Sequence, residues 1–171
     1  DSRITDHPAY LSGQVEVQDE GSQLIALACQ ASDGELLVDL CAGAGGKSLA
    51  LANAAPGARM IACDTNRQRL SRIAPRAFRS GARIEQRLLN SPNEAQGLAD
   101  LEGQADLVLV DAPCSGSGTW RRNPEGRWRL TPERLDRLLT LQMRVLDLAA
   151  PLVKPGGRLV YCVCSLEREE G

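Results

Sequence analysis

The sequence predicts an α/β fold in which helices cover both faces of an open, parallel β-sheet, giving three layers. Short apolar runs alternate along the chain with segments whose apolar residues recur at helical spacing, as in strand-helix-strand units. The first apolar run leads into a glycine-rich turn, residues 43–46, which lets the backbone approach a nucleotide at a helix N-terminus. With 171 residues and 43% hydrophobic residues, the chain can bury one core, and we expect a single domain over residues 1–171.

Five strands are expected because five apolar runs are bounded by polar or turn residues. They cover residues 36–40, 59–63, 83–88, 106–110 and 158–163. Strands that alternate with helices form parallel sheets through right-handed crossovers, so their carboxyl ends are expected at one edge of the sheet. Ligands of open α/β sheets bind outside that edge, and the residues that follow each strand are therefore the first candidates for a site.

Apolar residues at helical spacing predict three helices, at residues 18–30, 47–54 and 66–79. Pro75 is expected to kink the third of them, because proline lacks the backbone N–H that a helix interior uses. The longest predicted helix covers residues 132–150, with Thr131 as its N-cap and a proline at its first position. The sequence KPGG at residues 154–157 predicts a turn before the last strand.

The single predicted domain divides into two parts. Residues 1–34 form a lead-in segment and a helix, and residues 35–171 form the predicted cofactor-binding core. Only a short acidic run follows the fifth strand, whose far side lacks a partner, so we expect a fragment whose sheet is truncated there. No apolar run approaches the ~20 residues that cross a bilayer, and the N-terminus lacks the apolar core of a signal peptide. A cytoplasmic protein without membrane contact is therefore expected.

Composition narrows the possible partners. The net charge of −2 argues against a uniformly basic nucleic-acid-binding protein. Arginine is nevertheless concentrated at residues 120–137, where two tryptophans lie among six arginines. This combination suits phosphate contact and base stacking, but it equally suits a solvated, ion-paired surface. Six cysteines without a CxxC pair, together with a single histidine, predict reduced thiols and no metal site.

The glycine-rich turn fits one kind of cofactor better than two others. A phosphate-binding loop of the form GxxxxGK[ST] would need glycine at Cys41, and a dinucleotide-binding GxGxxG would need glycine at Ser48. Asp39 ahead of clustered glycines is closer to the pattern of S-adenosylmethionine sites. Asp64 closes the next strand about 20 residues further on, where an acid can bind ribose hydroxyls, and it could also cap the helix that follows.

Two cysteines are placed where strands are expected to end. Cys114 lies in DAPCSGSG after the fourth strand, and Cys164 lies in YCVCS at the end of the fifth. Because neighbouring parallel strands end at one edge, the two thiols could meet over one substrate, and a thiolate adds to electron-poor carbon. The alternative is that each is a small buried hydrophobic residue. Cys162 is expected on the same face of the strand as Cys164.

Taken together, these segments resemble those of a known family. CAGAGGKS, DAPCSGSG with RRNPEGRW, and YCVCS resemble motifs I, IV and VI of the RNA cytosine-C5 methyltransferases of the NOL1/NOP2/Sun family, and VQDEGSQL resembles the segment ahead of motif I. The resemblance covers nearly the whole chain and points to the bacterial type that acts on small-subunit ribosomal RNA. It implies a Rossmann-like, S-adenosylmethionine-dependent methyltransferase fold and methylation of cytosine C5 in RNA, with ribosomal RNA favoured and transfer RNA possible.

The resemblance also implies roles for individual residues. Cys164 would be the nucleophile that adds to carbon 6 of cytosine, and Cys114 would assist the elimination that frees the RNA. Asp111 would contact the base or the cofactor edge and favour protonation at N3, and Lys47 would place a cation near the cofactor or Asp111. The implied cofactor-binding residues are Cys41, Ala42, Gly43, Ala44, Gly45, Gly46, Lys47, Asp64, Asn90 and Asp111.

Three positions depart from the family pattern, and three other functions stay open. Ala44 replaces a proline, Asn90 replaces an aspartate and Val163 replaces a threonine. DNA cytosine-C5 methylation would use a motif IV cysteine such as Cys114 as its nucleophile, but it gives no reason for Cys164. A non-catalytic RNA-binding scaffold could keep the fold, and the glycine turn alone would also suit a dehydrogenase.

Overall fold

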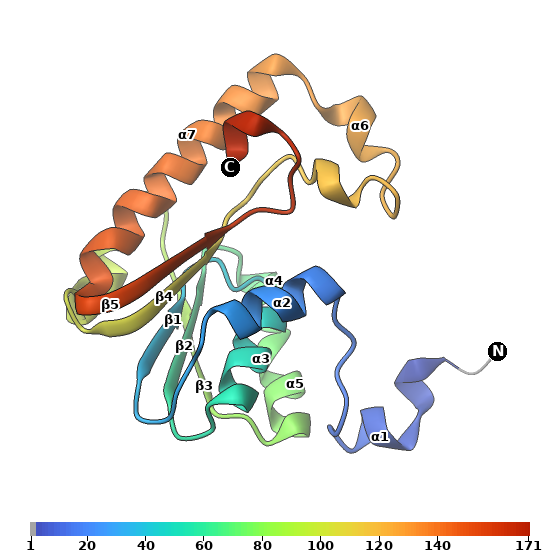
Figure 1. Cartoon of the computed structure of the whole chain (residues 1–171), viewed down its shortest axis with the longest axis vertical. Coiled ribbons are helices and arrows are strands. Elements are labelled where there is room, and N and C mark those ends of the chain that lie inside the picture. The colour runs from blue at the N-terminus through green and yellow to red at the C-terminus, as the bar shows by residue number, and fades with distance from the viewer. Residues whose placement is uncertain (1–2) are drawn as a thin grey trace.

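A computed structural model of the chain describes residues 3–171 and contains one parallel sheet with the strand order β3-β2-β1-β4-β5 (Figure 1). Each pair of neighbouring strands is parallel, so all five carboxyl ends lie at one edge, as predicted. The order reverses between β1 and β4, which is where open α/β sheets bind ligands. The strands are β1 Leu36–Asp39, β2 Arg59–Asp64, β3 Ile84–Leu88, β4 Ala105–Asp111 and β5 Val153–Cys162.

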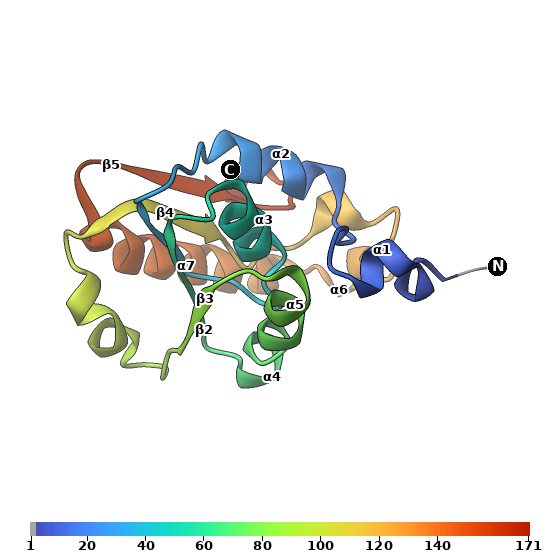
Figure 2. The same cartoon turned by 90° about the horizontal axis from the view of Figure 1, so that it is seen from below.

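Helices pack on both faces of the sheet and confirm the three-layer architecture (Figures 1 and 2). The α-helices are α1 Pro8–Leu11, α2 Glu20–Ala28, α3 Gly46–Ala54, α4 Arg67–Leu70, α5 Ile73–Ser80, α6 Gly126–Arg129 and α7 Pro132–Ala149. The 3-10 helices are η1 Ile4–Asp6, η2 Glu94–Leu101, η3 Ser117–Thr119, η4 Ala150–Leu152 and η5 Arg168–Glu170. None of the helices in residues 3–171 combines the length and the apolar character that crossing a membrane requires.

The core is divided by the sheet, because successive side chains of a strand point to opposite faces. On one face, Leu37 of β1 and Leu107 of β4 are buried with residues of α2 and α3. On the other face, the next residues along, Val38 and Val108, are buried with Val145 of α7 and with residues of η2. β1 and β4 are buried on both faces, so their sequences are nearly continuous apolar runs, and this pattern allowed both strands to be predicted.

The helix predicted at residues 66–79 is interrupted one turn ahead of Pro75, so it forms two helices in place of one kinked helix. The break falls at residues 71–72, between α4 and α5, and Pro75 is the third residue of α5. Proline has no N–H to bond the C=O of residue 71 and its ring crowds that carbonyl, so the break falls one turn ahead of it. The N-cap of the long helix α7 is Thr131, as predicted, and its side chain accepts a hydrogen bond from the backbone N–H of Arg134.

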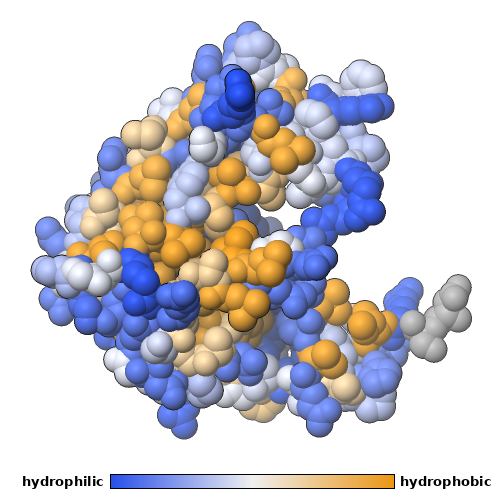
Figure 3. Space-filling model, in the orientation of Figure 1, coloured by the Kyte–Doolittle hydropathy of each residue, from blue (hydrophilic) through white to orange (hydrophobic). Residues whose placement is uncertain are grey.

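The last strand begins earlier than predicted and contains the predicted turn as a bulge. Ala105 pairs with Val153 and Leu107 pairs with Arg158, so residues 154–157 leave the ladder opposite a single residue of β4. Gly156 takes a positive φ of 78° there. β5 is an edge strand of the sheet within residues 3–171. Figure 3 shows apolar surface over β5 and α2, where Leu27 and Leu159 are exposed.

Candidate active site

A cavity of about 460 Å³ lies at the carboxyl edge of the sheet, beyond the ends of β1 and β4. It lies at the point where the strand order reverses, and its volume is within the range of small-molecule sites. The two predicted catalytic cysteines, Cys114 and Cys164, both line it, and so does Asp111. Six further predicted cofactor-binding residues also line it, and they are Cys41, Ala42, Gly43, Ala44, Gly46 and Lys47.

The glycine turn that forms one wall of this cavity has a backbone that only glycine adopts easily. Gly43 and Gly45 have φ values of 56° and 81°. A Cβ on Gly45 would lie 2.7 Å from Ile73 Cγ1, so this residue supports the turn from behind and does not line the cavity. Gly46 is the first residue of α3, and the open N-terminus of that helix therefore borders the cavity, where it favours polar or anionic groups.

Asp39, at the end of β1, is a buried acid in the wall of the cavity. Its side chain is 1% exposed, and Ser48 Oγ donates a 2.6 Å hydrogen bond to Oδ2. The other oxygen, Oδ1, is buried and has no hydrogen-bond partner among residues 3–171. Burial raises the pKa of this carboxyl from 3.8 to about 7. Asp39 lines the cavity, and a carboxylate oxygen without a hydrogen-bond partner is suited to a ligand that brings a cationic N–H group.

Asp64 lies beside the glycine turn but outside the main cavity. Its Oδ2 accepts a 2.8 Å hydrogen bond from Gly43 N–H, and its Oδ1 accepts one of 2.7 Å from Asn66 N–H. Arg69 also pairs with it at 3.3 Å. The N-cap of α4 is Asn66, so the alternative that Asp64 caps this helix is wrong. Asp64 and Arg69 line an adjoining cavity of about 140 Å³.

The structure leaves one predicted cofactor residue apart from this arrangement. Asn90 follows β3 and is exposed, and it lines neither the main cavity nor the adjoining one. Its backbone C=O accepts a 2.7 Å hydrogen bond from Asn93 N–H, so the segment turns here before η2 begins. In residues 3–171 no group of three or more histidine, cysteine or acidic side chains could hold a metal ion.

Lys47 and Asp111 form an ion pair at the centre of the site. Lys47 Nζ lies 2.7 Å from Asp111 Oδ2 and also donates to Ser22 Oγ at 3.2 Å. Burial alone would lower the pKa of Lys47, but the hydrogen bond and charge of Asp111 outweigh it, so this pKa lies above 10.5. The resemblance implied that Lys47 places a cation near the cofactor or Asp111, and the structure shows Lys47 in contact with Asp111.

The two predicted catalytic cysteines meet, with 3.4 Å between Cys114 Sγ and Cys164 Sγ. The hydrogen bond shared with Cys114 lowers the pKa of Cys164 from 9.0 to about 7, despite partial burial. The same contact, together with burial, raises the pKa of Cys114 well above its ordinary range. Either sulfur can donate in this contact; because Cys164 is the more exposed of the two, its thiolate is the better solvated, and we assign it as the thiolate of the pair near neutral pH.

Cys162 does not join this pair. Its thiol lies 3.6 Å from Asp111 Oδ1 and packs against the core on the α2 side of the sheet. Burial and the charge of Asp111 raise the pKa of Cys162 to about 12, so it stays protonated at neutral pH. The side chain lines neither the main cavity nor the one beyond Cys164, in the part of the chain that the structure describes.

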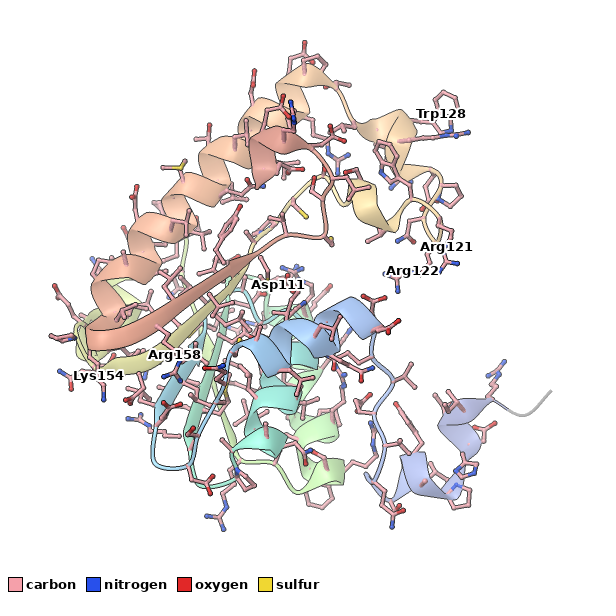
Figure 4. All side chains as sticks on the ribbon, viewed as in Figure 1. Asp111, Arg121, Arg122, Trp128, Lys154 and Arg158 are labelled. Atoms are coloured by element: carbon pink, nitrogen blue, oxygen red, sulfur yellow. The ribbon has the colours of Figure 1, made fainter. Side chains whose placement is uncertain are left out.

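A second cavity, of about 330 Å³, lies on the other side of Cys164 and Asp111 and extends toward the arginine-rich loop. Arg121 and Arg122 line it, and Figure 4 shows them on the loop after η3, facing the N-terminal end of α2. Arg122 forms a 2.9 Å ion pair with Asp19 just ahead of that helix. Further along the loop, Trp128 is 77% exposed, and the guanidinium of Arg127 lies 4.6 Å from the centre of its ring.

Three functional contacts were not foreseen from the sequence. Asp19 and Ser22 lie in the segment VQDEGSQL, which stands out in the sequence only because it resembles the segment ahead of motif I. In the structure Asp19 forms an ion pair with Arg122. Ser22 accepts a hydrogen bond from Lys47. Glu170 lies in the acidic run after β5, for which no role was expected, yet it is 2% exposed. In each case the partner is at least 25 residues away in the chain, so a local pattern gives no sign of the contact.

Comparisons with known proteins agree with this geometry. The sequence model of the family "16S rRNA methyltransferase RsmB/F" matches residues 25–171. "Ribosomal RNA small subunit methyltransferase B" of Salmonella paratyphi B is 38% identical over 163 residues, which are 95% of this chain and 38% of that protein. The protein of the same name from Salmonella arizonae is 39% identical with the same coverage. The chain thus spans 38% of the length of these curated relatives.

Solved structures lead to the same conclusion. PH0851 superposes with a TM-score of 0.91 and 34% identity, over 99% of this chain and 38% of that one. NSun6 from Pyrococcus horikoshii, solved with SFG, superposes with a TM-score of 0.86 and 25% sequence identity, over 99% of this chain and 43% of that one. Since the family match covers residues 25–171, the chain belongs to the RsmB/F family of 16S rRNA methyltransferases, which are S-adenosylmethionine-dependent and have this Rossmann-like fold.

Proposed function

We propose that this chain is the catalytic part of an enzyme that methylates carbon 5 of cytosine in small-subunit ribosomal RNA through a covalent cysteine adduct. The observation that supports this best is the pair Cys114 and Cys164, with 3.4 Å between their sulfurs, at the border of two cavities. The 460 Å³ cavity suits a cofactor, and the 330 Å³ cavity opens toward Arg121 and Arg122. Such an activity belongs to the cytoplasm, where bacterial ribosomal RNA is made and assembled.

The residues around the main cavity fit S-adenosylmethionine, of which the SFG bound by NSun6 is an analogue. The unsatisfied Oδ1 of Asp39 suits the ammonium of the methionine part, and the open N-terminus of α3 suits its carboxylate. Asp64 and the adjoining 140 Å³ cavity suit the ribose and the adenine. When bound, the cofactor supplies an electrophilic methyl group, and the side chains of this chain must make cytosine receptive to it.

Carbon 5 of cytosine is a weak nucleophile, and covalent addition overcomes this. The Cys164 thiolate forms a bond to carbon 6, and the electron pair displaced from the ring double bond makes carbon 5 enamine-like. Asp111 lies between the two cavities, where it suits the N3 edge of the base and favours protonation there. Once Cys164 is bonded to carbon 6, Cys114 no longer faces a thiolate and can release its own proton to solvent. After methylation Cys114 takes up the proton of carbon 5, the double bond re-forms and Cys164 leaves as a thiolate.

The direct test is methylation of defined RNAs by the full chain with S-adenosylmethionine carrying a labelled methyl group. We expect label in 16S ribosomal RNA as 5-methylcytosine, identified by nuclease digestion and mass spectrometry, and none in transfer RNA. Label confined to transfer RNA would mean that transfer RNA, and not ribosomal RNA, is the substrate. Label in duplex DNA would instead support DNA methylation, and absence of transfer by a protein that binds the cofactor would support the non-catalytic scaffold.

Replacing Asp39 with asparagine is expected to separate cofactor binding from folding. The folded pKa of about 7 lies above the ordinary 3.8, so the folded state holds a proton that the unfolded chain has lost, and stability falls as pH rises from about 4 to 7. Asp39→Asn removes this penalty and should raise Tm at pH 8, by about 2–4 °C for each kcal/mol regained. The same change should weaken cofactor binding at least about tenfold, because it removes a charged hydrogen bond.

Differential scanning fluorimetry at two pH values and calorimetric titration with the cofactor check this prediction. At pH 4, close to the ordinary pKa, most of the penalty is absent, so wild type and variant should differ little in Tm. Equal cofactor affinity in the two proteins would contradict the assigned role of Asp39.

The arginines at the mouth of the second cavity are expected to bind the RNA backbone. Changing Arg121 and Arg122 together to glutamine should weaken RNA affinity about tenfold and lower the salt dependence by about 0.7 for each phosphate that is no longer bound. The matched control is the pair Arg59→Gln and Lys154→Gln, which removes the same charge at the amino ends of β2 and β5. Figure 4 shows Lys154 far from Arg121 and Arg122. Fluorescence anisotropy at several salt concentrations measures both double variants.

The control also decides between the two interpretations of the arginine-rich segment. An equal loss of affinity in both double variants would mean that only net charge matters. No loss in either would mean that Arg121 and Arg122 belong to a solvated, ion-paired surface.

A further inference from the structure

Behind the two cysteines lies a buried polar cluster that the proposed chemistry does not use. Its centre is Glu170 of η5, an acid whose side chain is 2% exposed. Glu170 Oε1 accepts hydrogen bonds from Ser115 N–H at 2.8 Å and from Gln142 Nε2 at 2.9 Å, and Oε2 accepts from Ser115 Oγ. Gln142 lies on α7, is 3% exposed, and also donates to the backbone C=O of Pro113 at 3.0 Å.

The hydroxyls in this cluster belong to the residues that follow the two cysteines. Ser115 follows Cys114, and Ser165 follows Cys164; their Oγ atoms are 3.0 Å apart. Ser117 Oγ lies 3.3 Å from Ser165 Oγ and accepts a 2.8 Å hydrogen bond from Leu166 N–H. A continuous chain of hydrogen bonds therefore connects α7, the loop after β4 and the loop after β5.

A carboxylate in this place needs an explanation, because a buried charge is costly unless donors surround it. Here the donors are neutral, and no arginine, lysine or histidine in residues 3–171 forms an ion pair with Glu170. Burial alone would raise the pKa of Glu170, but the hydrogen bonds from Ser115, Ser165 and Gln142 outweigh it and lower this pKa below 4.5. The carboxylate is thus held as a multiple hydrogen-bond acceptor, a role that fixes backbone and side chains in place.

We propose that Glu170 is a positioning residue, which fixes the loop of Cys114 against the loop of Cys164 and thereby sets the 3.4 Å separation of their sulfurs. Its catalytic consequence rests on the proposed function: the two thiols share a hydrogen bond only while both loops keep this register. Displacement of reacting groups by about 1 Å can cost about a hundredfold in rate. Glu170 itself touches neither cavity, so it acts through Ser115 and Ser165.

The separation of the sulfurs can be tested without RNA, by oxidising the full chain with diamide. The two thiols lose two protons and two electrons to form one S–S bond, and the N=N bond of diamide takes them up as a hydrazine. The initial rate of Cys114–Cys164 crosslinking, followed by peptide mass spectrometry, reports how often the two sulfurs are in register. The variants are Glu170→Ala and Glu170→Gln, and the matched control is Glu169→Ala, which changes an exposed acid one residue away.

In Glu170→Ala, crosslinking should slow by about tenfold or more, because the substitution removes every hydrogen bond to the carboxylate. In Glu170→Gln it should stay within about threefold of wild type, because an amide oxygen still accepts from Ser115 N–H and Gln142. Glu169→Ala should match wild type. Crosslinking of Glu170→Ala at the wild-type rate overturns the proposal, and so does an equal loss in Glu169→Ala.

Should circular dichroism show Glu170→Ala to be unfolded, Ser115→Ala decides instead. It removes the hydroxyl that bonds both Glu170 Oε2 and Ser165 Oγ, while Ser115 N–H and Gln142 stay bonded to the carboxylate, and an unchanged crosslinking rate would overturn the proposal. Methyl transfer by the same variants completes the test: kcat should fall with crosslinking while cofactor Kd stays unchanged. A chain that never methylates RNA would refute the proposed function, and the crosslinking rates would still decide the role of Glu170.

Discussion

Cys164→Ala is expected to abolish both methyl transfer and the covalent RNA adduct, with a loss of about 10⁴-fold or more in single-turnover rate. The reason is that no other sulfur can take over. Cys114 is the protonated partner of the pair, and Cys162, with a pKa of about 12, is held as a thiol against Asp111. Transfer of labelled methyl to 16S ribosomal RNA under excess enzyme measures the effect.

Cys114→Ala is the matched change at the other sulfur, and it is expected to trap the adduct instead of preventing it. Addition to carbon 6 needs only the Cys164 thiolate, whereas release of the RNA needs Cys114, so adduct should accumulate on a denaturing gel. The variant also loses the hydrogen bond that lowers the pKa of Cys164 to about 7, so this pKa should return toward 9.0. At pH 7 the thiolate fraction would fall from about one half to about one hundredth, and the rate of addition should become steeper with pH.

Two results would contradict this division of roles. If Cys114→Ala abolished the adduct and Cys164→Ala kept it, the nucleophile would be the motif IV cysteine, as in DNA cytosine-C5 methyltransferases. If the Cys114→Ala adduct survived the addition of Cys164→Ala, a third nucleophile would be involved.

Asp111→Asn should produce the second largest effect, a fall of about 10²–10³ in kcat. The carboxylate is the partner of Lys47 at 2.7 Å and lines both cavities, so it can hold the base while charge develops on the ring. Asparagine keeps the shape but loses the charge, and it leaves the ammonium of Lys47 half-buried without its counter-ion. Cofactor affinity should change far less than kcat, because Asp39 and the glycine turn keep their places.

Asp106→Asn is the control for this prediction. Asp106 lies on the same strand, β4, at its amino end, where it accepts a 2.9 Å hydrogen bond from Leu36 N–H and pairs with Lys154. Its loss should lower Tm without a comparable fall in kcat. Equal falls in kcat for the two variants would mean that Asp111 acts through folding and not at the reacting base.

The strands and the glycine turn could be predicted because their signals are local. A stretch of strand buried on both faces is apolar, as over residues 107–110 of β4, and a turn with φ values of 56° and 81° favours glycine. The interruption of the helix ahead of Pro75 has a local signal too, but its form does not: Leu70 and Ile73, on either side of the break, are both buried in one cluster under β2.

The same distinction explains the site. The two cysteines were expected to meet because topology alone brings the ends of β4 and β5 together. Asp19, Ser22 and Glu170 were not expected, because their positions depend on how loops fold over that edge and on partners 25 or more residues away. The assignment of Asn90 to the cofactor stays a prediction, since the residue is exposed and outside both cofactor-side cavities.

The hydrogen bond between the two sulfurs also makes this chain a selective target for covalent ligands. Four of its six thiols are unreactive near neutral pH, since burial raises their pKa to about 11 for Cys29 and about 12 for Cys41, Cys63 and Cys162. Cys114 does not line the 330 Å³ cavity, whereas Cys164 does. An electrophilic small molecule that enters the 330 Å³ cavity therefore meets one nucleophilic sulfur, Cys164, and attaches at the position where the base would be held.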